Sequence, residues 1–373
     1  MVEPIFPSIR IIPSEDVISR NGFVRELEER LFMGDSTMLA GPRRIGKTSV
    51  AIEVLNRLRE RGIYTVAIDL SCVTSAEKLG FQLIRKVFQV LTGVVRPAAH
   101  TINGLLESLS KPEILVKVED LEITSHLNEA KENPETILDE TFHIAEVSAE
   151  TDHKRMVIMF DEWQEIARIG GESLLKRLRS IFQRQSHVSY LFLGSEPSTM
   201  RALFADRRQA FYRFATMLDL PDITTDEWNE YVHRKLTQAG ITIDRDAFDE
   251  LMDTSGGHAY DTMVILQNMD IQLRLNRMDH VDISLVRQSI RQSYNQLEAL
   301  YNQVWQIALN IRGADKVLTA LMEGTPPYRA DTTAVITRAL DRLIDASILS
   351  RQRRGEYQFA DPMFKTWLQQ KMG

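Results

Sequence analysis

The sequence predicts an α/β fold: a parallel sheet flanked by helices, followed by a helical region and a small C-terminal domain. Short apolar runs typical of buried strands alternate with helical patterns through the first 220 residues. A loop with two glycines, residues 41–48, joins the first of these strands to a helix. Beyond residue 220 the apolar positions recur at helical spacing, and strand patterns return only within residues 348–359.

The composition is that of an ordinary water-exposed globular protein. The chain has 373 residues, of which 43% are hydrophobic and 26% charged, with a net charge of −7. This length accommodates two or three domains. No apolar run is long enough to span a membrane, and the first residues lack the pattern of a secretory signal. The single cysteine, Cys72, excludes an internal disulfide framework. We therefore expect a cytoplasmic location and no membrane partner.

The glycine-containing loop has the spacing of a phosphate-binding loop. It reads Gly41-Pro42-Arg43-Arg44-Ile45-Gly46-Lys47-Thr48, with Ser49 continuing into the helix. The glycines allow backbone N–H groups to point into one concavity that can hold phosphate oxygens. Lys47 supplies a flexible positive charge for phosphates, and the Thr48 hydroxyl suits Mg²⁺. The loop predicts a P-loop NTPase fold, with residues 41–49 binding ATP and Mg²⁺ as the associated metal.

A second stretch, residues 156–162, places two acidic residues at the end of an apolar run. Parallel α/β sheets bind ligands at the carboxyl ends of their strands. Asp161 is therefore expected to hold Mg²⁺ together with Thr48, and Glu162 to orient and polarise the attacking water.

Two further residues are candidates for sensing the terminal phosphate. Ser195 follows the strand predicted over 188–193, so its hydroxyl either reaches the γ-phosphate or attacking water, or caps the next helix. Arg213 belongs to a basic cluster and either supplies charge to a γ-phosphate, within its own chain or a neighbouring subunit, or lies on the surface. A role between subunits requires a homo-oligomer.

Charge divides the remaining chain into distinct parts. Residues 100–150 hold twelve acidic residues against three lysines and no arginine, which fits helical cover with a solvated face or a surface for a protein partner. Helices are predicted over 225–239, 244–254, 259–275 and 282–310. The turn at residues 255–258 either approaches the nucleotide or simply ends a helix.

The last 63 residues follow a helix, helix, two-strand ribbon and helix order, the outline of a winged helix-turn-helix. Ten basic residues against seven acidic ones make this part positive in an otherwise acidic chain. Arg351, Arg353 and Arg354 lie at the expected ribbon tip, where they could contact DNA phosphates. Domains of this outline also serve as protein-contact modules, so the pattern is compatible with either DNA or a protein as the partner.

The loop with its double arginine resembles that of the archaeal-type P-loop ATPases, which are similar to AAA+ and STAND ATPases. The resemblance extends over residues 160–165, 192–195, 211–213 and 361–367. It implies an AAA+-like core at 1–220, a helical lid at 221–310 and a winged helix at 311–373. The family does not fix a biological role, and our leading interpretation is a Mg²⁺-dependent ATP-binding switch with slow hydrolysis. The alternatives are an ATP-regulated DNA-binding protein of the origin or transposition type, and a protein-interaction scaffold.

Overall fold

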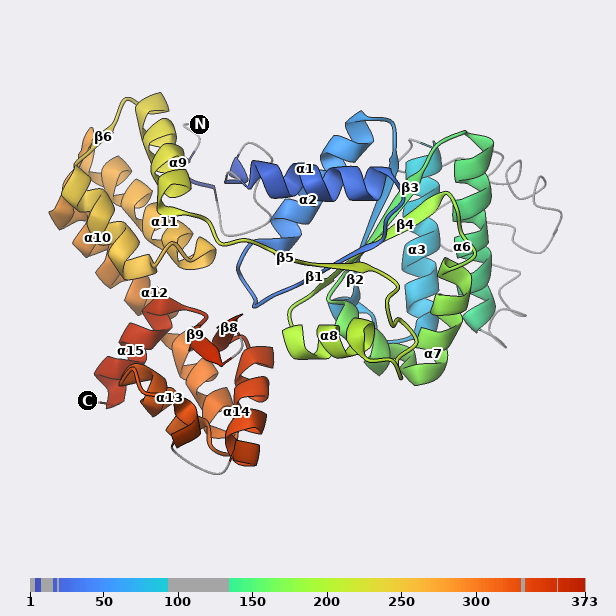
Figure 1. Ribbon diagram of the computed structural model, residues 1–373. Helices are drawn as coiled ribbons and strands as arrows, with labels where there is room; N and C mark the ends of the chain where they lie inside the picture. Colours follow the sequence, from blue (N-terminus) through green and yellow to red (C-terminus); the bar gives the residue numbers. More distant parts are fainter. Residues whose placement is uncertain are drawn as a thin grey trace.

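A five-stranded parallel sheet forms the first part of the molecule (Figure 1). This computed structural model describes residues 4–7, 16–18, 20–92, 134–329, 333–353 and 355–372. Residues 100–133 of the predicted acidic segment, and Arg354, lie outside this part. The strands are β1 (Thr37–Ala40), β2 (Tyr64–Asp69), β3 (Met156–Asp161), β4 (Val188–Gly194) and β5 (Thr216–Asp219).

The strand order, β2-β3-β4-β1-β5, positions the candidate site. Every neighbouring pair is parallel. Strand β4 lies between β1 and β3, so the segments that follow these three strands meet at one edge of the sheet. Strand β5 was not predicted, because this edge strand alternates between half-buried and exposed residues and lacks an apolar run.

Helices cover both faces of the sheet because buried strand residues alternate between them. Met159 packs toward one helical layer and Phe160 toward the other. The first layer contains α1 (Asn21–Phe32) and α2 (Lys47–Glu60). The second contains α3 (Ala76–Thr92), α6 (Pro134–Thr151), α7 (Ile166–Phe182) and α8 (Pro197–Ala205). Helix α7 contains a break at Gly171, whose φ is +64°.

Single-turn 3₁₀ helices occur in connections of the described part of the chain. They are η2 (Leu70–Cys72), η3 (Trp163–Glu165) and η4 (Pro327–Arg329). In the described part of the chain, no helix is both long and apolar enough to cross a membrane.

The region after β5 is helical, as predicted. It contains α9 (Thr225–Gln238), α10 (Arg245–Ser255), α11 (Ala259–Asn276) and α12 (Ile283–Leu309), with a two-stranded pair of β6 (Thr242–Ile243) and β7 (His280–Val281). Thr224 caps α9 through a reciprocal bond pair with Glu227. Gly256 ends α10 with φ +57°, so the 255–258 turn does serve as a helix terminus.

The C-terminal elements occur in the predicted order. They are α13 (Ala314–Met322), α14 (Thr333–Asp345), the antiparallel ribbon β8 (Leu349–Arg353) and β9 (Glu356–Phe359), and α15 (Pro362–Met372). Buried side chains from α9 through α15 form one continuous hydrophobic cluster. Phe6 and Ile18 also pack in this cluster. The N-terminal segment, expected with the sheet domain, therefore packs on the helical region where it is described.

Candidate functional site

The loop after β1 is a tight turn in which both glycines are required. Gly46 has φ +93° directly before α2, a conformation that other residues adopt only with strain. A Cβ on Gly41 would lie 2.7 Å from Cδ1 of Ile45. The loop therefore closes on itself and leads into the N-terminus of α2, where backbone N–H groups favour anions.

Lys47 is buried inside this loop. Its side-chain ammonium donates to the carbonyl oxygens of Gly41, at 2.8 Å, and Pro42, at 2.7 Å. Burial lowers the pKa of Lys47 to about 8, although the carboxylates of Glu162 and Asp161 oppose this shift. A cation held in this way gains electrostatic stabilisation when an anion enters the loop.

Thr48 and Asp161 meet across the space between α2 and β3. The Thr48 hydroxyl donates to Oδ2 of Asp161 at 2.7 Å. The backbone N–H of Glu162 donates to the other carboxylate oxygen at 2.9 Å. Burial raises the pKa of Asp161, although the hydrogen bond from Thr48 and the charge of Lys47 oppose this shift. A hydroxyl beside a buried carboxylate is a donor set that fits Mg²⁺ next to phosphates.

Glu162 is held by Ser195 and Gln164. The Ser195 hydroxyl, 1% exposed, donates to Oε2 of Glu162 at 2.6 Å. The Gln164 amide donates to the same oxygen and, at 3.2 Å, to the Ser195 hydroxyl. Arg43 donates from Nε to that hydroxyl at 3.3 Å. Because Glu196, not Ser195, occupies the cap position of α8, the hydroxyl serves the carboxylate and not the helix.

The remaining P-loop residues connect the loop to other parts of the chain. Arg44 has φ +70°, and its guanidinium lies over the ring of Tyr260 in α11, 4.5 Å from the ring centre. The Ile45 carbonyl accepts from Nη1 of Arg20 at 2.9 Å. Ser49 lies in the first turn of α2.

Comparisons with known proteins show likeness in structure only. No protein-family model matches the sequence, and no curated protein matches it. A Walker-type ATPase of Pyrococcus abyssi is similar, with a TM-score of 0.69 and 17% identity over 97% of this chain and 99% of that one. The ORC2 protein of Aeropyrum pernix, solved as ADPNP–ADP complexes, has a TM-score of 0.59 and 13% identity over 99% and 98%.

The ORC1 protein of Aeropyrum pernix, solved in complex with DNA, is also similar, with a TM-score of 0.50 and 14% identity over 99% and 96% of the two chains. The chain has the fold of the archaeal Walker-type P-loop ATPases. The predicted fold class, an AAA+-like parallel-sheet core, is confirmed.

Within this P-loop fold, Arg213 lies far from the loop of its own chain. It precedes β5, whose amino end is Thr216, whereas the P-loop follows the carboxyl end of β1. The two positions are separated by at least the length of a four-residue strand, about 13 Å. Arg213 is exposed and its guanidinium lies over the Tyr212 ring. A direct role of Arg213 in its own site is therefore inconsistent with this arrangement.

Sequence reasoning missed a contact between the P-loop and the turn after α14. Ser347, with φ +57°, accepts from the backbone N–H of Arg43 at 2.9 Å and donates to the Ser195 carbonyl at 3.4 Å. Asp345 accepts from the Ser198 N–H at 3.0 Å and so caps α8. The C-terminal elements therefore touch both the P-loop and the end of β4.

Arg20 is the other residue that sequence reasoning missed. It is 7% exposed, and burial lowers its pKa to about 10 against the opposing carboxylates of Asp222 and Glu227. A Cβ on Gly46 would lie 3.2 Å from its Nη1. Arg20 thus supports the loop backbone, and no local pattern in the sequence marks it.

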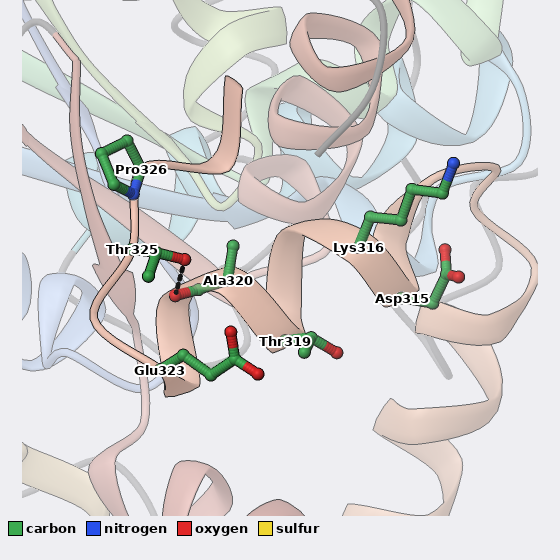
Figure 2. Close-up of a pocket in the computed structure, with 7 residues that line it drawn as sticks. All are labelled: Asp315, Lys316, Thr319, Ala320, Glu323, Thr325 and Pro326. Atoms are coloured by element: carbon green, nitrogen blue, oxygen red, sulfur yellow. Dashed lines mark hydrogen bonds between the residues drawn. The ribbon is translucent and has the colours of Figure 1, made fainter. Parts of the chain in front are cut away.

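A surface hollow of about 350 Å³ lies elsewhere, along α13 (Figure 2). Its lining residues come from this helix and the turn after it: Asp315, Lys316, Thr319, Ala320, Glu323, Thr325 and Pro326. None of the predicted nucleotide-binding residues lines it, so it does not belong to the candidate site.

Proposed function

We infer that this protein binds ATP with Mg²⁺, hydrolyses it slowly, and uses the nucleotide state to control docking of its C-terminal elements. The observation that carries this proposal is the convergence of Lys47, the Thr48–Asp161 contact and the held Glu162 at one sheet edge. Three chemical tasks, phosphate binding, metal binding and water activation, are thereby assigned to groups from three adjacent segments.

Each residue has a distinct task in this proposal. When bound, ATP would supply the γ-phosphoryl group and Mg²⁺ would neutralise its charge. Lys47 would exchange two loop carbonyls for phosphate oxygens. Thr48 and Asp161 would hold the metal. Glu162 would orient the attacking water once Ser195 and Gln164 release its carboxylate, so turnover is slow while those bonds persist.

Coupling to the C-terminal elements would act through Ser347. Its hydroxyl occupies the Arg43 N–H, a P-loop backbone donor, and contacts the Ser195 carbonyl. If nucleotide binding rearranges the P-loop or the segment that contains Ser195, both contacts of Ser347 change. The two arrangements then differ in affinity for nucleotide, which is the requirement for a switch.

Binding and turnover of purified protein test the proposal. Lys47→Ala should lose ATP binding, whereas Glu162→Gln should bind ATP as the wild type does and release no phosphate. Glu165→Gln is the matched control, because this nearby carboxylate pairs with Arg168 instead of facing the loop. Wild-type turnover by Glu162→Gln, or full ATP affinity in Lys47→Ala, would remove the assigned roles.

A second candidate function is ATP-regulated DNA binding through a C-terminal winged helix. Arg351 and Arg353 are exposed on β8, while the third predicted arginine, Arg354, lies outside the described residues. The similar ORC1 protein of Aeropyrum pernix was solved with DNA. Gel-shift assays with and without ATP should show salt-dependent binding that falls when these arginines are neutralised. Unchanged binding in that variant would exclude this surface, and no DNA binding by the wild type would favour a protein partner.

Self-association is part of the proposal, because Arg213 can reach a nucleotide only in another subunit. Light scattering after size exclusion should show a defined oligomer with a non-hydrolysable ATP analogue. A monomer under every nucleotide condition would make Arg213 a surface residue.

A further inference from the structure

Three potential metal ligands gather where α11 meets α15. His258 directly precedes α11, Asp261 lies in its first turn, and Asp361 caps α15 by accepting from the Phe364 N–H at 2.6 Å. One ligand atom from each residue lies within 4.8 Å of the others. The side chains of His258 and Asp261 are 9% and 0% exposed. Asp261 is buried and the other two residues are partly buried, unlike the exposed acidic groups that are common on protein surfaces.

The polar atoms of this cluster lie close together, and a hydrogen bond between its two carboxyl groups requires a proton on one of them. Nδ1 of His258 and Oδ2 of Asp261 are 3.1 Å apart, yet neither atom has a hydrogen-bond partner. The other carboxylate oxygen of Asp261 also lacks a partner. Asp361 faces Asp261, and two ionised carboxylates can only accept hydrogen bonds. Such an arrangement in the interior carries a high electrostatic cost unless a cation or a proton lies between the groups.

Tyr301 of α12 provides an independent observation. It is 1% exposed, its hydroxyl is buried without a hydrogen-bond partner, and the charges of Asp361 and Asp261 act on it. Its ring packs against Phe364 and Trp367 of α15, which fixes its position beside the cluster. A buried hydroxyl requires a partner, and this one belongs to a third helix that packs against α15.

The surrounding charges leave a net negative site. Arg44 of the P-loop, stacked on Tyr260, is the cation that acts on His258 and Asp261. Two carboxyl groups and one imidazole in the same place form a donor set that suits a cation.

We propose that His258, Asp261 and Asp361 bind one divalent transition-metal ion of the Zn²⁺ class, separate from the Mg²⁺ of the P-loop. An imidazole nitrogen with carboxylate oxygens suits Zn²⁺ better than Mg²⁺, which prefers oxygen ligands. Ligands around Zn²⁺ at bond lengths of about 2.0–2.2 Å lie roughly 3–4 Å apart, so small side-chain rotations close the observed spacing. Tyr301 or a water completes the coordination.

The ion would join α11 to α15 and so tie the helical region to the last helix of the chain. Pro362 supports this junction, because its ring lies 2.8 Å from where a Cβ on Gly256 would be. Arg44 extends the same junction to the P-loop. A bound metal would hold these three segments in the arrangement described above.

Metal binding by the full-length protein, without nucleotide, tests this site independently of the proposed ATPase. Chelator-treated protein is titrated with Zn²⁺ by calorimetry and with Co²⁺ by visible absorption. We expect one equivalent of each ion, an absorption spectrum of protein-bound Co²⁺, and a higher melting temperature with Zn²⁺. Affinity should fall by about 100-fold in His258→Gln and in Asp361→Asn, since each removes a ligand.

Two control variants locate the binding. His280→Gln removes an exposed histidine that contacts Asp244 at 3.2 Å, and Asp161→Asn removes the carboxylate at the end of β3 that accepts from Thr48. Both should keep wild-type Zn²⁺ affinity. X-ray absorption on the wild-type Zn²⁺ complex should show one imidazole among oxygen ligands, and this measurement serves even where a ligand variant fails to fold. The proposal would be overturned if the wild type bound neither Zn²⁺ nor Co²⁺, a result that means the carboxyls share a proton. An equal loss of affinity in His280→Gln would also overturn it.

Discussion

Raising the pH above 8 is expected to weaken ATP binding, because Lys47 then loses the proton that phosphate oxygens require. In the structure its ammonium is buried against two carbonyl oxygens, and its pKa is lowered to about 8. Bound phosphates place negative charge beside the buried ammonium and so offset its loss of solvation. They therefore raise the pKa of Lys47 to at least its ordinary value of about 10.5. ATP binding above pH 8 therefore takes up one proton.

The magnitude follows from linkage between these two pKa values. The dissociation constant should be nearly constant from pH 7 to 7.5 and then rise toward tenfold per pH unit. At pH 9.5 the loss is about 30-fold, or about 2 kcal/mol, because one pKa unit corresponds to about 1.4 kcal/mol. The opposite sign, tighter binding at higher pH, would require a lysine that gives up its proton on binding.

Calorimetry of ATP binding in buffers of different ionisation enthalpy measures this proton uptake directly. The uptake should be near zero at pH 7 and approach one proton at pH 9. Lys47→Arg is the control, because a guanidinium stays protonated throughout this range. A flat pH profile in the wild type, or the same decline in Lys47→Arg, would refute the assignment of the pKa shift to nucleotide binding.

Three other substitutions give distinct results. Ser195→Ala should leave ATP affinity unchanged and alter the rate of phosphate release by about 100-fold. The rate should fall if the Ser195 hydroxyl acts on the transition state, and rise if it only restrains the adjacent carboxylate. An unchanged rate would exclude both roles of the hydroxyl. Gly194→Ala places a Cβ 2.3 Å from Met200 and should lower the free energy of unfolding by about 1–3 kcal/mol in urea titrations. Gly22→Ala is the control, because Gly22 has open space around it, and it should leave the free energy of unfolding unchanged. Arg213→Ala should lower turnover only at protein concentrations where oligomers form, and a loss in dilute monomer would contradict the position of this residue.

Much of the candidate site was predictable because its residues follow strand ends. Lys47 and Thr48 belong to one contiguous motif, and Asp161 follows a run of buried residues. Ser195 could be placed beside them once its strand was expected next to β3, and the register confirms that pairing. Arg213 could not be placed, because the short edge strand after it has no apolar signature.

The sequence alone predicted most of the strands and helices, with β5 as an exception, and it indicated the segments proposed here for phosphate, metal and water chemistry. Periodicity and loop motifs are local properties, so they can be recognised in the sequence without knowing which segments pack together. Only the tertiary structure decided that Ser347 reaches Arg43, 304 residues away, that Phe6 is buried among α9–α15, and that His258 and Asp361 share one interior space. These contacts form only when several helices pack against one another together, and no single stretch of sequence encodes that packing.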